Sequence, residues 1–168
     1  MSLRRLCEDY EPSMMGTIVY NRMRYGTCYF GFNVHVAFAE TVLHNEVADP
    51  KHGGVRIACS EFDRYVFTFE GAPLKVAVLH GVPLKSIGGD GSLSTVTPYS
   101  LPQQWSRAVH DHGAGVDGFL YISRHVNTEE ALVVFERAKK KIKLKEAVKF
   151  LDYPGAARVL ADFKVHPI

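Results

Sequence analysis

Two segments that lie far apart in the sequence constrain the fold of this chain more than any other feature. Tyr29–Glu40 begins as an aromatic strand pattern, turns at a glycine and an asparagine, and continues at helical spacing to a glutamate. Asp117–Ser123 is a short apolar run that ends in a serine, with an arginine after it. Both segments must be buried, so each delivers one polar side chain, Glu40 or Ser123, to the end of a packed element. A carboxylate, a hydroxyl and nearby guanidinium groups predict a site for a charged, hydroxyl-rich ligand.

The remaining patterns predict one α+β domain over residues 1–168. Strands are expected at 17–20, 27–32, 73–79, 118–122 and 131–135, where β-branched, aromatic and apolar residues gather in short runs. Helices are expected at about 34–45, 100–112 and 155–163. The stretch 60–69 fits either a short helix or a strand. In the basic segment 139–168, alternation at 139–145 is typical of an edge strand whose lysines discourage edge-to-edge pairing.

Two of the expected helices have a defined apolar side. Asn33 is a suitable N-cap for the first helix. Its apolar face would consist of Val34, Ala37, Phe38, Thr41 and Val42, which leaves Glu40 away from the centre of that face. The helix at 100–112 would bury Leu101, Trp105, Ala108, Val109 and His112. Trp105 is therefore interpreted as a core residue.

Composition excludes several classes of protein. The chain has 168 residues, 46% of them hydrophobic and 23% charged, which is typical of a globular domain. No apolar stretch approaches the roughly 18 residues of a membrane span, and no signal-peptide pattern opens the chain, so a cytoplasmic protein is expected. A formal net charge of +2 is too small to indicate nucleic-acid binding, and the lysine run fits a solvated edge strand better than a nucleic-acid patch.

The familiar metal and phosphate motifs are not found in the sequence. The three cysteines are irregularly spaced, without a Cys-x-x-Cys pair. His110 and His112 point away from each other on a helix, and neither His35 nor His44 has a ligand at a matching offset, so no metal site is predicted. The glycine-rich stretch 88–91 lacks the Gly-Lys-Ser/Thr of a phosphate loop. The loop at 88–98 is instead expected to lie over a site.

Several segments in the same order resemble the RES domain family. Tyr29 followed by Ala37–Glu40 is similar to that family's tyrosine and Ala-x-Ala-Glu pattern. Asp117–His125 is similar to its Asp-Gly strand that ends in Tyr-x-Ser-Arg-His, and Ala131–Glu136 to the strand that comes next. The resemblance covers roughly residues 24–138. Each motif alone is weak, but their order is specific.

The resemblance implies an ADP-ribosyltransferase-like fold, with a mixed or antiparallel split sheet and flanking helices. Many members of the family are toxins that pair with an Xre-type helix-turn-helix antitoxin. Such toxins degrade NAD+ by cleaving the nicotinamide–ribose bond, either by phosphorolysis or by hydrolysis. The resemblance therefore implies NAD+ as substrate, inorganic phosphate or water as acceptor, an antitoxin as partner, and no bound cofactor or metal. It leaves a homodimer open.

Carried over residue by residue, the family's glutamate is Glu40, its serine is Ser123 and its strand tyrosine is Tyr29. The family's arginine is Arg24, in the basic turn before Tyr29, with Arg22 as the other candidate. The glutamate would stabilise positive charge on the ribose, and arginine would grip the pyrophosphate with its bidentate fork. The serine would hydrogen-bond the ribose or the amide, and the tyrosine would pack on the nicotinamide ring.

Two further points stay open at the level of sequence. Arg124 is either a second phosphate contact or a surface charge. Two other functions compete with NAD+ degradation. One is transfer of ADP-ribose to a macromolecule by the same fold. The other is a catalytically impaired interaction module, because the arginine-bearing loop is shorter here than is usual in the family.

Overall fold

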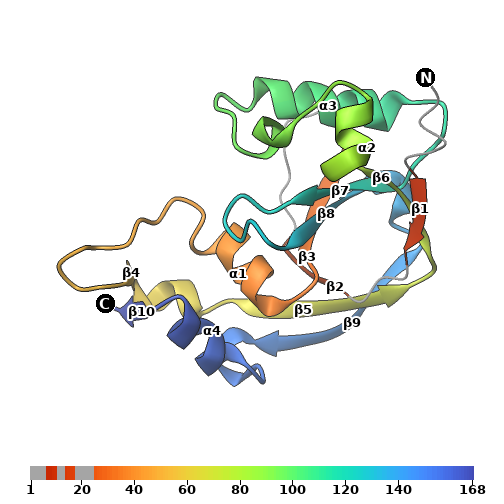
Figure 1. Ribbon diagram of the computed structural model, residues 1–168. Coiled ribbons are helices and arrows are strands. Elements are labelled where there is room, and N and C mark those ends of the chain that lie inside the picture. The colour runs from red at the N-terminus through yellow and green to blue at the C-terminus, as the bar shows by residue number, and fades with distance from the viewer. Residues whose placement is uncertain (1–6, 11–13, 18–24) are drawn as a thin grey trace.

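The computed structural model describes residues 7–10, 14–17 and 25–168 (Figure 1). The strands are β1 (Cys7–Tyr10), β2 (Met14–Thr17), β3 (Thr27–Gly31), β4 (Val55–Ile57), β5 (Tyr65–Gly71), β6 (Leu74–Val78), β7 (Gly118–Ile122), β8 (Glu130–Phe135), β9 (Ile142–Lys149) and β10 (Val165–Pro167). The α-helices are α1 (Val34–Thr41), α2 (Gly81–Ser86), α3 (Ser100–Asp111) and α4 (Ala156–Asp162). Short 3₁₀ turns are η2 (Cys59–Phe62), η3 (Gly91–Ser94), η4 (Glu136–Ala138) and η5 (Phe150–Asp152).

Eight of these strands form one sheet in the order β1-β6-β7-β8-β3-β2-β5-β9, and β10 and β4 form a separate pair. Within the larger sheet β6 and β7 run parallel, and the other neighbouring strands run antiparallel. Figure 1 shows α2 and α3 beside β6, β7 and β8, whereas α1 and α4 lie toward β5 and β9. The predicted α+β class with a mixed sheet and flanking helices is confirmed.

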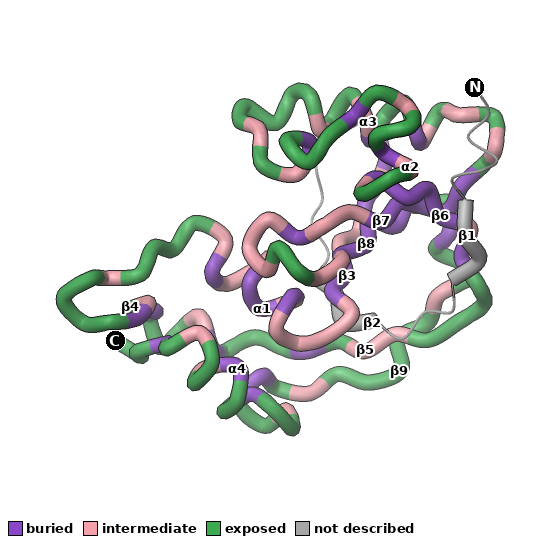
Figure 2. Tube along the Cα trace, viewed as in Figure 1, coloured by how far each residue is buried: buried purple, intermediate pink, exposed green. Residues whose placement is uncertain are grey.

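The central strand β8 shows why this sheet is buried on both faces. Val133 and Phe135 point into a core that they share with α2 and α3, and Leu132 and Val134 point into a second core on the opposite face. Phe69 of β5 packs against that second core. Figure 2 shows buried residues concentrated in β6, β7 and β8. The continuous apolar run of β8 is therefore explained by burial on both faces.

The first helix was predicted correctly at its start but not at its end or on its buried face. Asn33 caps α1, because its Oδ1 accepts a hydrogen bond from the backbone N–H of Val36 at 2.9 Å. The helix ends at Thr41, not near residue 45. Its buried residues are Val36, Phe38 and Ala39, so the expected face was wrong in part. The reason is that α1 packs on β3 and β2 and also on α4, which leaves Ala37 and Thr41 at a cavity wall.

The second predicted helix shows a similar pattern. Its range is confirmed by α3, but Leu101 and Ala108 are exposed, and the buried side chains are Ser106 and Val109. Ser106 is buried because it accepts a hydrogen bond from the hydroxyl of Tyr25 at 2.9 Å. The buried side of α3 therefore includes Ser106, whose partner Tyr25 lies just before β3.

The other expected elements are placed as follows. Strands at 73–79, 118–122 and 131–135 are confirmed by β6, β7 and β8, and the stretch 60–69 is a 3₁₀ turn followed by strand β5. The basic alternation becomes β9, which forms an edge of the sheet as predicted, and the last helix is α4. Residues 18–20 of the first expected strand lie outside the described residues.

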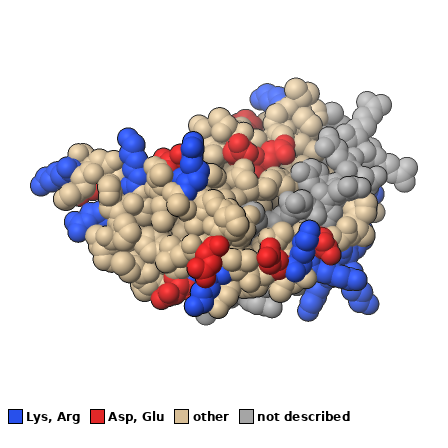
Figure 3. Space-filling view, turned by 90° about the horizontal axis from the view of Figure 1, so that it is seen from below, with Lys and Arg blue, Asp and Glu red and all other residues tan. Residues whose placement is uncertain are grey.

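The surface charges and the helix lengths bear on two classes considered above, nucleic-acid-binding proteins and membrane-spanning proteins. On the face shown in Figure 3, Lys and Arg stand in separate groups with Asp and Glu between them, and Lys145 lies 3.6 Å from Glu70. This mixed distribution on that face fits the interpretation of the lysine run as a solvated edge strand. Among the helices that the structure describes, none has the length and apolar character needed to cross a membrane.

Candidate functional site

A cavity of about 630 Å³ lies where the carboxyl-terminal end of α1 meets the sheet and α3. Aromatic side chains from β3, β7 and α3 form part of its walls, among them Tyr29, Phe119, Tyr121 and Trp105. Leu93 and Ser94 of the loop at 88–98 also line it, so that loop lies over the site as expected. A volume of this size is typical of sites that bury most of a small ligand.

Glu40 is the carboxylate on the wall of this cavity. It stands in the last turn of α1, whose start is fixed by the Asn33 cap, and both of its oxygens have partners. Oε1 accepts a hydrogen bond from the hydroxyl of Ser123 at 2.5 Å, and Oε2 lies 3.5 Å from the hydroxyl of Tyr121. The structure therefore brings together the two residues that the sequence placed at the ends of separate apolar segments.

Ser123 holds this carboxylate from behind. It is fully buried, at 0% exposure, and is not among the residues that line the cavity. Its Oγ accepts hydrogen bonds from the backbone N–H groups of His125 at 3.2 Å and Val126 at 3.1 Å. Because those N–H groups occupy its lone pairs, its own hydrogen is directed to Glu40. This geometry favours a positioning role for Ser123, and the direct contact with the ligand that the resemblance implied stays a prediction.

Two tyrosines, Tyr29 and Tyr121, lie on the cavity wall beside the carboxylate of Glu40. Tyr29 lines the cavity as predicted, and burial raises the pKa of its phenol. Burial also raises the pKa of Tyr121 well above its usual range, and the nearby charge of Glu40 adds to that effect. Both phenols thus remain protonated at neutral pH and are able to donate hydrogen bonds. Tyr121 was missed because an aromatic residue in an apolar strand normally indicates core packing.

Arginine side chains supply positive charge at the cavity. Arg124 and Arg64 both line it. Arg124 donates from Nε to Nε2 of His125 at 3.0 Å, and its guanidinium carbon lies 5.6 Å from the centre of the Tyr99 ring. Arg64, which had no sequence motif to mark it, donates to the carbonyl of Glu61 at 3.1 Å and forms an ion pair with the carboxylate of the same residue. The predicted Arg22 and Arg24 lie outside the described residues.

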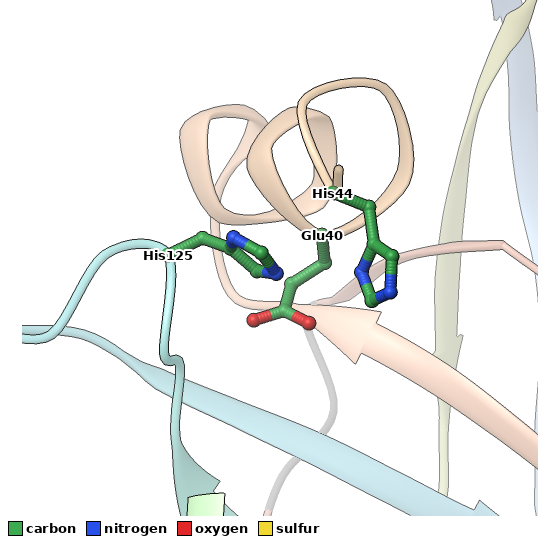
Figure 4. A group of neighbouring side chains, drawn as sticks. All are labelled: Glu40, His44 and His125. Atoms are coloured by element: carbon green, nitrogen blue, oxygen red, sulfur yellow. The ribbon is translucent and has the colours of Figure 1, made fainter. Parts of the chain in front are cut away.

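Two histidines complete the surroundings of the carboxylate. Figure 4 shows Glu40 between His44, just beyond α1, and His125, in the loop after β7. Burial lowers the pKa of His125, an effect that Glu40 opposes and Arg124 reinforces. The sequence argument considered offsets among the histidines and overlooked that Glu40 precedes His44 by one helical turn. No spacing rule linked His125 to either residue.

The arrangement defines the class of protein. A carboxylate fixed by a hydroxyl group faces a cavity with aromatic walls and guanidinium groups, on a single α+β domain. Such a site can stabilise positive charge that develops in a ligand with aromatic and anionic parts.

The chain belongs to the RES domain family, because the sequence model of that family matches residues 12–155. A relative named probable toxin y4kH, from Sinorhizobium fredii, is 37% identical over 68 residues. That match covers 40% of this chain and 53% of the relative, so the chain spans about half the length of the curated relative.

A solved structure confirms the type of fold. The chain aligns with a chain of the M. tuberculosis MbcT–MbcA toxin–antitoxin complex with a TM-score of 0.60 and 11% identity, covering 96% of both chains. At that identity the likeness shows the fold alone. The likeness confirms that the chain shares the α+β fold of that solved chain.

Proposed function

We propose that this chain is an NAD+-degrading toxin of a toxin–antitoxin system that cleaves the nicotinamide–ribose bond. The observation that carries the proposal is the Glu40 carboxylate, held by Ser123 at the wall of a cavity with aromatic sides and guanidinium groups. These groups match three parts of NAD+: the aromatic nicotinamide cation, the ribose attached to it with its free hydroxyls, and the pyrophosphate. Membership of the RES domain family supports the same assignment.

The reaction asks little of the protein beyond charge stabilisation and positioning. As the bond between ribose C1′ and the ring nitrogen breaks, its electron pair goes to the nitrogen, and nicotinamide leaves as a neutral molecule. No general acid is needed, so one carboxylate suffices. Positive charge develops on the ribose, and Glu40 would stabilise it while accepting hydrogen bonds from the ribose hydroxyls.

The surrounding residues would hold the rest of the substrate. Tyr29 offers an aromatic face for the nicotinamide ring, and Arg124 or Arg64 would pair with the pyrophosphate. Arg24 and Arg22 remain proposed for the same task. Ser123 contributes by fixing the orientation of Glu40, so that the carboxylate needs no rearrangement as charge develops.

The acceptor is inorganic phosphate or water. In either case an acceptor oxygen forms a bond to C1′, and the acceptor loses one proton to solvent or to a nearby base. The proposed partner is an antitoxin of the Xre helix-turn-helix type. The solved structure of similar fold is a toxin–antitoxin complex by its title, which supports an antitoxin partner.

Product identification tests the proposal. The purified chain is incubated with NAD+, with and without inorganic phosphate, and the products are resolved by mass spectrometry. Release of nicotinamide with phosphorylated ADP-ribose supports phosphorolysis, and release with free ADP-ribose supports hydrolysis. Covalently modified protein or nucleic acid would instead show a transferase. NAD+ that stays intact under all conditions would contradict the proposal.

A further inference from the structure

We propose that Glu40, His44 and His125 form a binding site for a divalent transition-metal cation such as Zn²⁺, and that the bound ion blocks the Glu40 carboxylate. Each residue offers one ligand atom, and these atoms all lie within 4.8 Å of one another. Figure 4 shows the Glu40 side chain between the two imidazole rings. Two imidazoles and a carboxylate suit zinc and its first-row neighbours, whereas magnesium and calcium prefer oxygen ligands alone.

The separation of the two imidazole rings matches the separation expected around one ion. Two imidazoles on a tetrahedral zinc, at Zn–N distances of about 2.0–2.1 Å, have ring centroids about 5 Å apart. The centroids of His44 and His125 are 5.1 Å apart, and the ring planes make an angle of 52°. Small side-chain rotations would bring the three ligand atoms to the shorter spacing of a coordinated set. The fourth position would face the cavity and hold water.

A buried nitrogen in this group has no hydrogen-bond partner. Nδ1 of His44 is buried and unpartnered within the part of the chain that the structure describes. Buried polar atoms are rarely left without a partner, because an unmade hydrogen bond costs free energy. A bound cation would use the lone pair of this nitrogen. The observation is independent of the distances among the three residues.

The local structure explains why the three residues meet. Glu40 lies in the last turn of α1, and His44 lies in the turn that follows the end of the helix at Thr41. His125 is fixed from the other side, since its backbone N–H donates to the buried hydroxyl of Ser123. The carboxyl-terminal end of a helix also favours a nearby cation.

Arg124 competes with a metal at this site. Its Nε donates to Nε2 of His125 at 3.0 Å, and its Nη2 donates to the carbonyl oxygen of His44 at 3.4 Å. A metal that used Nε2 of His125 would displace this guanidinium, and the two positive charges would repel each other. Removing the charge of Arg124 is therefore expected to tighten metal binding, a result that a nonspecific surface site would not give.

The two parts of the proposal have different foundations. Metal binding depends only on the described geometry. Inhibition rests on the proposed function, because it assumes that Glu40 acts on the ribose of NAD+. The bound ion would then cover the carboxylate, and its positive charge would oppose the positive charge that develops on the ribose.

Direct titration of the purified, chelator-treated chain with Zn²⁺ tests the binding. Calorimetry gives affinity and stoichiometry, and Co²⁺ as a probe gives visible absorption that reports its coordination. One ion per chain is expected. His44→Ala and His125→Ala should each weaken binding by at least about tenfold, since even residues that only support a ligand cost 10–100-fold when changed. His52→Ala is the matched control, because His52 is exposed beside Asp49 and does not line the cavity.

Arg124→Gln is the second variant, and it should bind Zn²⁺ more tightly than the unaltered chain. This gain keeps the test decisive if a histidine variant fails to fold. Equal affinity of the unaltered chain and the double variant His44→Ala with His125→Ala would overturn the site. So would the lack of any binding by the unaltered chain, or a loss of affinity in His52→Ala equal to that in His44→Ala.

Rates of NAD+ cleavage test the inhibition. Saturating Zn²⁺ is expected to slow cleavage by the unaltered chain at least about tenfold, since the carboxylate is no longer available. His44→Ala, compared with its own rate without metal, should be less sensitive. Binding without inhibition would overturn the blocking of Glu40. If the chain cleaves no NAD+ at all, the proposed function fails, and the titration still decides the metal site.

Discussion

Ser123→Ala removes the hydroxyl group that fixes Glu40. In the structure this hydroxyl donates to Glu40 at 2.5 Å and accepts from the backbone N–H groups of His125 and Val126. The substitution adds no bulk, so the protein loses three hydrogen bonds at a site with 0% exposure and gains only a small void. Both the stability and the activity should therefore fall.

The expected loss of stability follows from these bonds. A hydrogen bond to a charged group contributes about 1.5–3 kcal/mol, and a backbone N–H left without an acceptor costs about 1 kcal/mol or more. Water can reach the half-buried loop and recover part of this, so the free energy of unfolding should fall by about 2–4 kcal/mol. For a chain of this length, that loss lowers the unfolding temperature by roughly 10 °C.

Urea unfolding followed by circular dichroism measures the loss, and the initial rate of NAD+ cleavage measures the effect on Glu40. The rate should fall by about tenfold to a hundredfold, mainly in kcat, because the carboxylate is no longer held in place. Ser86→Ala is the control, since its exposed hydroxyl bonds only to the carbonyl of Pro83, and it should stay within about 0.5 kcal/mol of the unaltered chain. A Ser123→Ala variant as stable and as active as this control would refute the reasoning.

Three further predictions concern Tyr121, Asp117 and His125. Tyr121→Phe removes a hydroxyl 3.5 Å from Glu40, so the free energy of unfolding in urea should change by less than about 1 kcal/mol. This variant should slow NAD+ cleavage less than Ser123→Ala does, and a larger loss of rate would contradict the prediction. Asp117→Ala removes a buried carboxylate that accepts from the backbone N–H of Lys75 at 2.8 Å, and should cost about 2–4 kcal/mol in the same assay; a change under 0.5 kcal/mol would count against it. Burial lowers the pKa of His125 below its ordinary 6.5, so the unfolded chain binds more protons as the pH falls below that value. Stability should therefore fall from about pH 7 down through the lowered pKa, and His125→Gln should show a weaker decline; equal declines in both proteins would exclude this role.

Several features of the fold could be predicted from the sequence because they depend on neighbouring residues. Asn33 marked the start of α1, since an N-cap needs only its own side chain and the next backbone N–H groups. The apolar runs of β7 and β8 predicted buried strands, and the sheet buries both on two faces. Glu40 of α1 and Ser123 after β7 belong to segments that the sequence placed in one site, and the structure brings them into contact.

Other features could not be predicted from the local sequence pattern. The helix α1 ends early because the N–H groups of Val42 and Leu43 both donate to the carbonyl of Phe38, after which the chain turns away. Tyr121 looked like a core residue because nothing in its strand reveals that Glu40 lies beside its hydroxyl. Arg64 lacked a motif for the same reason, since only the folded chain brings it to the cavity.

The role of Ser123 is another example. A serine at the end of a strand indicates a polar group near a site, but not on which side of Glu40 it lies. Its burial and its two backbone donors place it behind the carboxylate. The resemblance placed Ser123 and Glu40 in one site, and the hydrogen bond between them is a finding of the structure.

The central claim is that Glu40 stabilises positive charge on the ribose of NAD+, and Glu40→Gln tests it most directly. Glutamine keeps the shape of the side chain and an oxygen that accepts from Ser123, but removes the charge. NAD+ cleavage should fall at least about tenfold to a hundredfold, with circular dichroism unchanged. Glu46→Gln, an exposed residue that does not line the cavity, should keep the full rate. A folded Glu40→Gln variant that consumes NAD+ as fast as the unaltered chain would contradict the account.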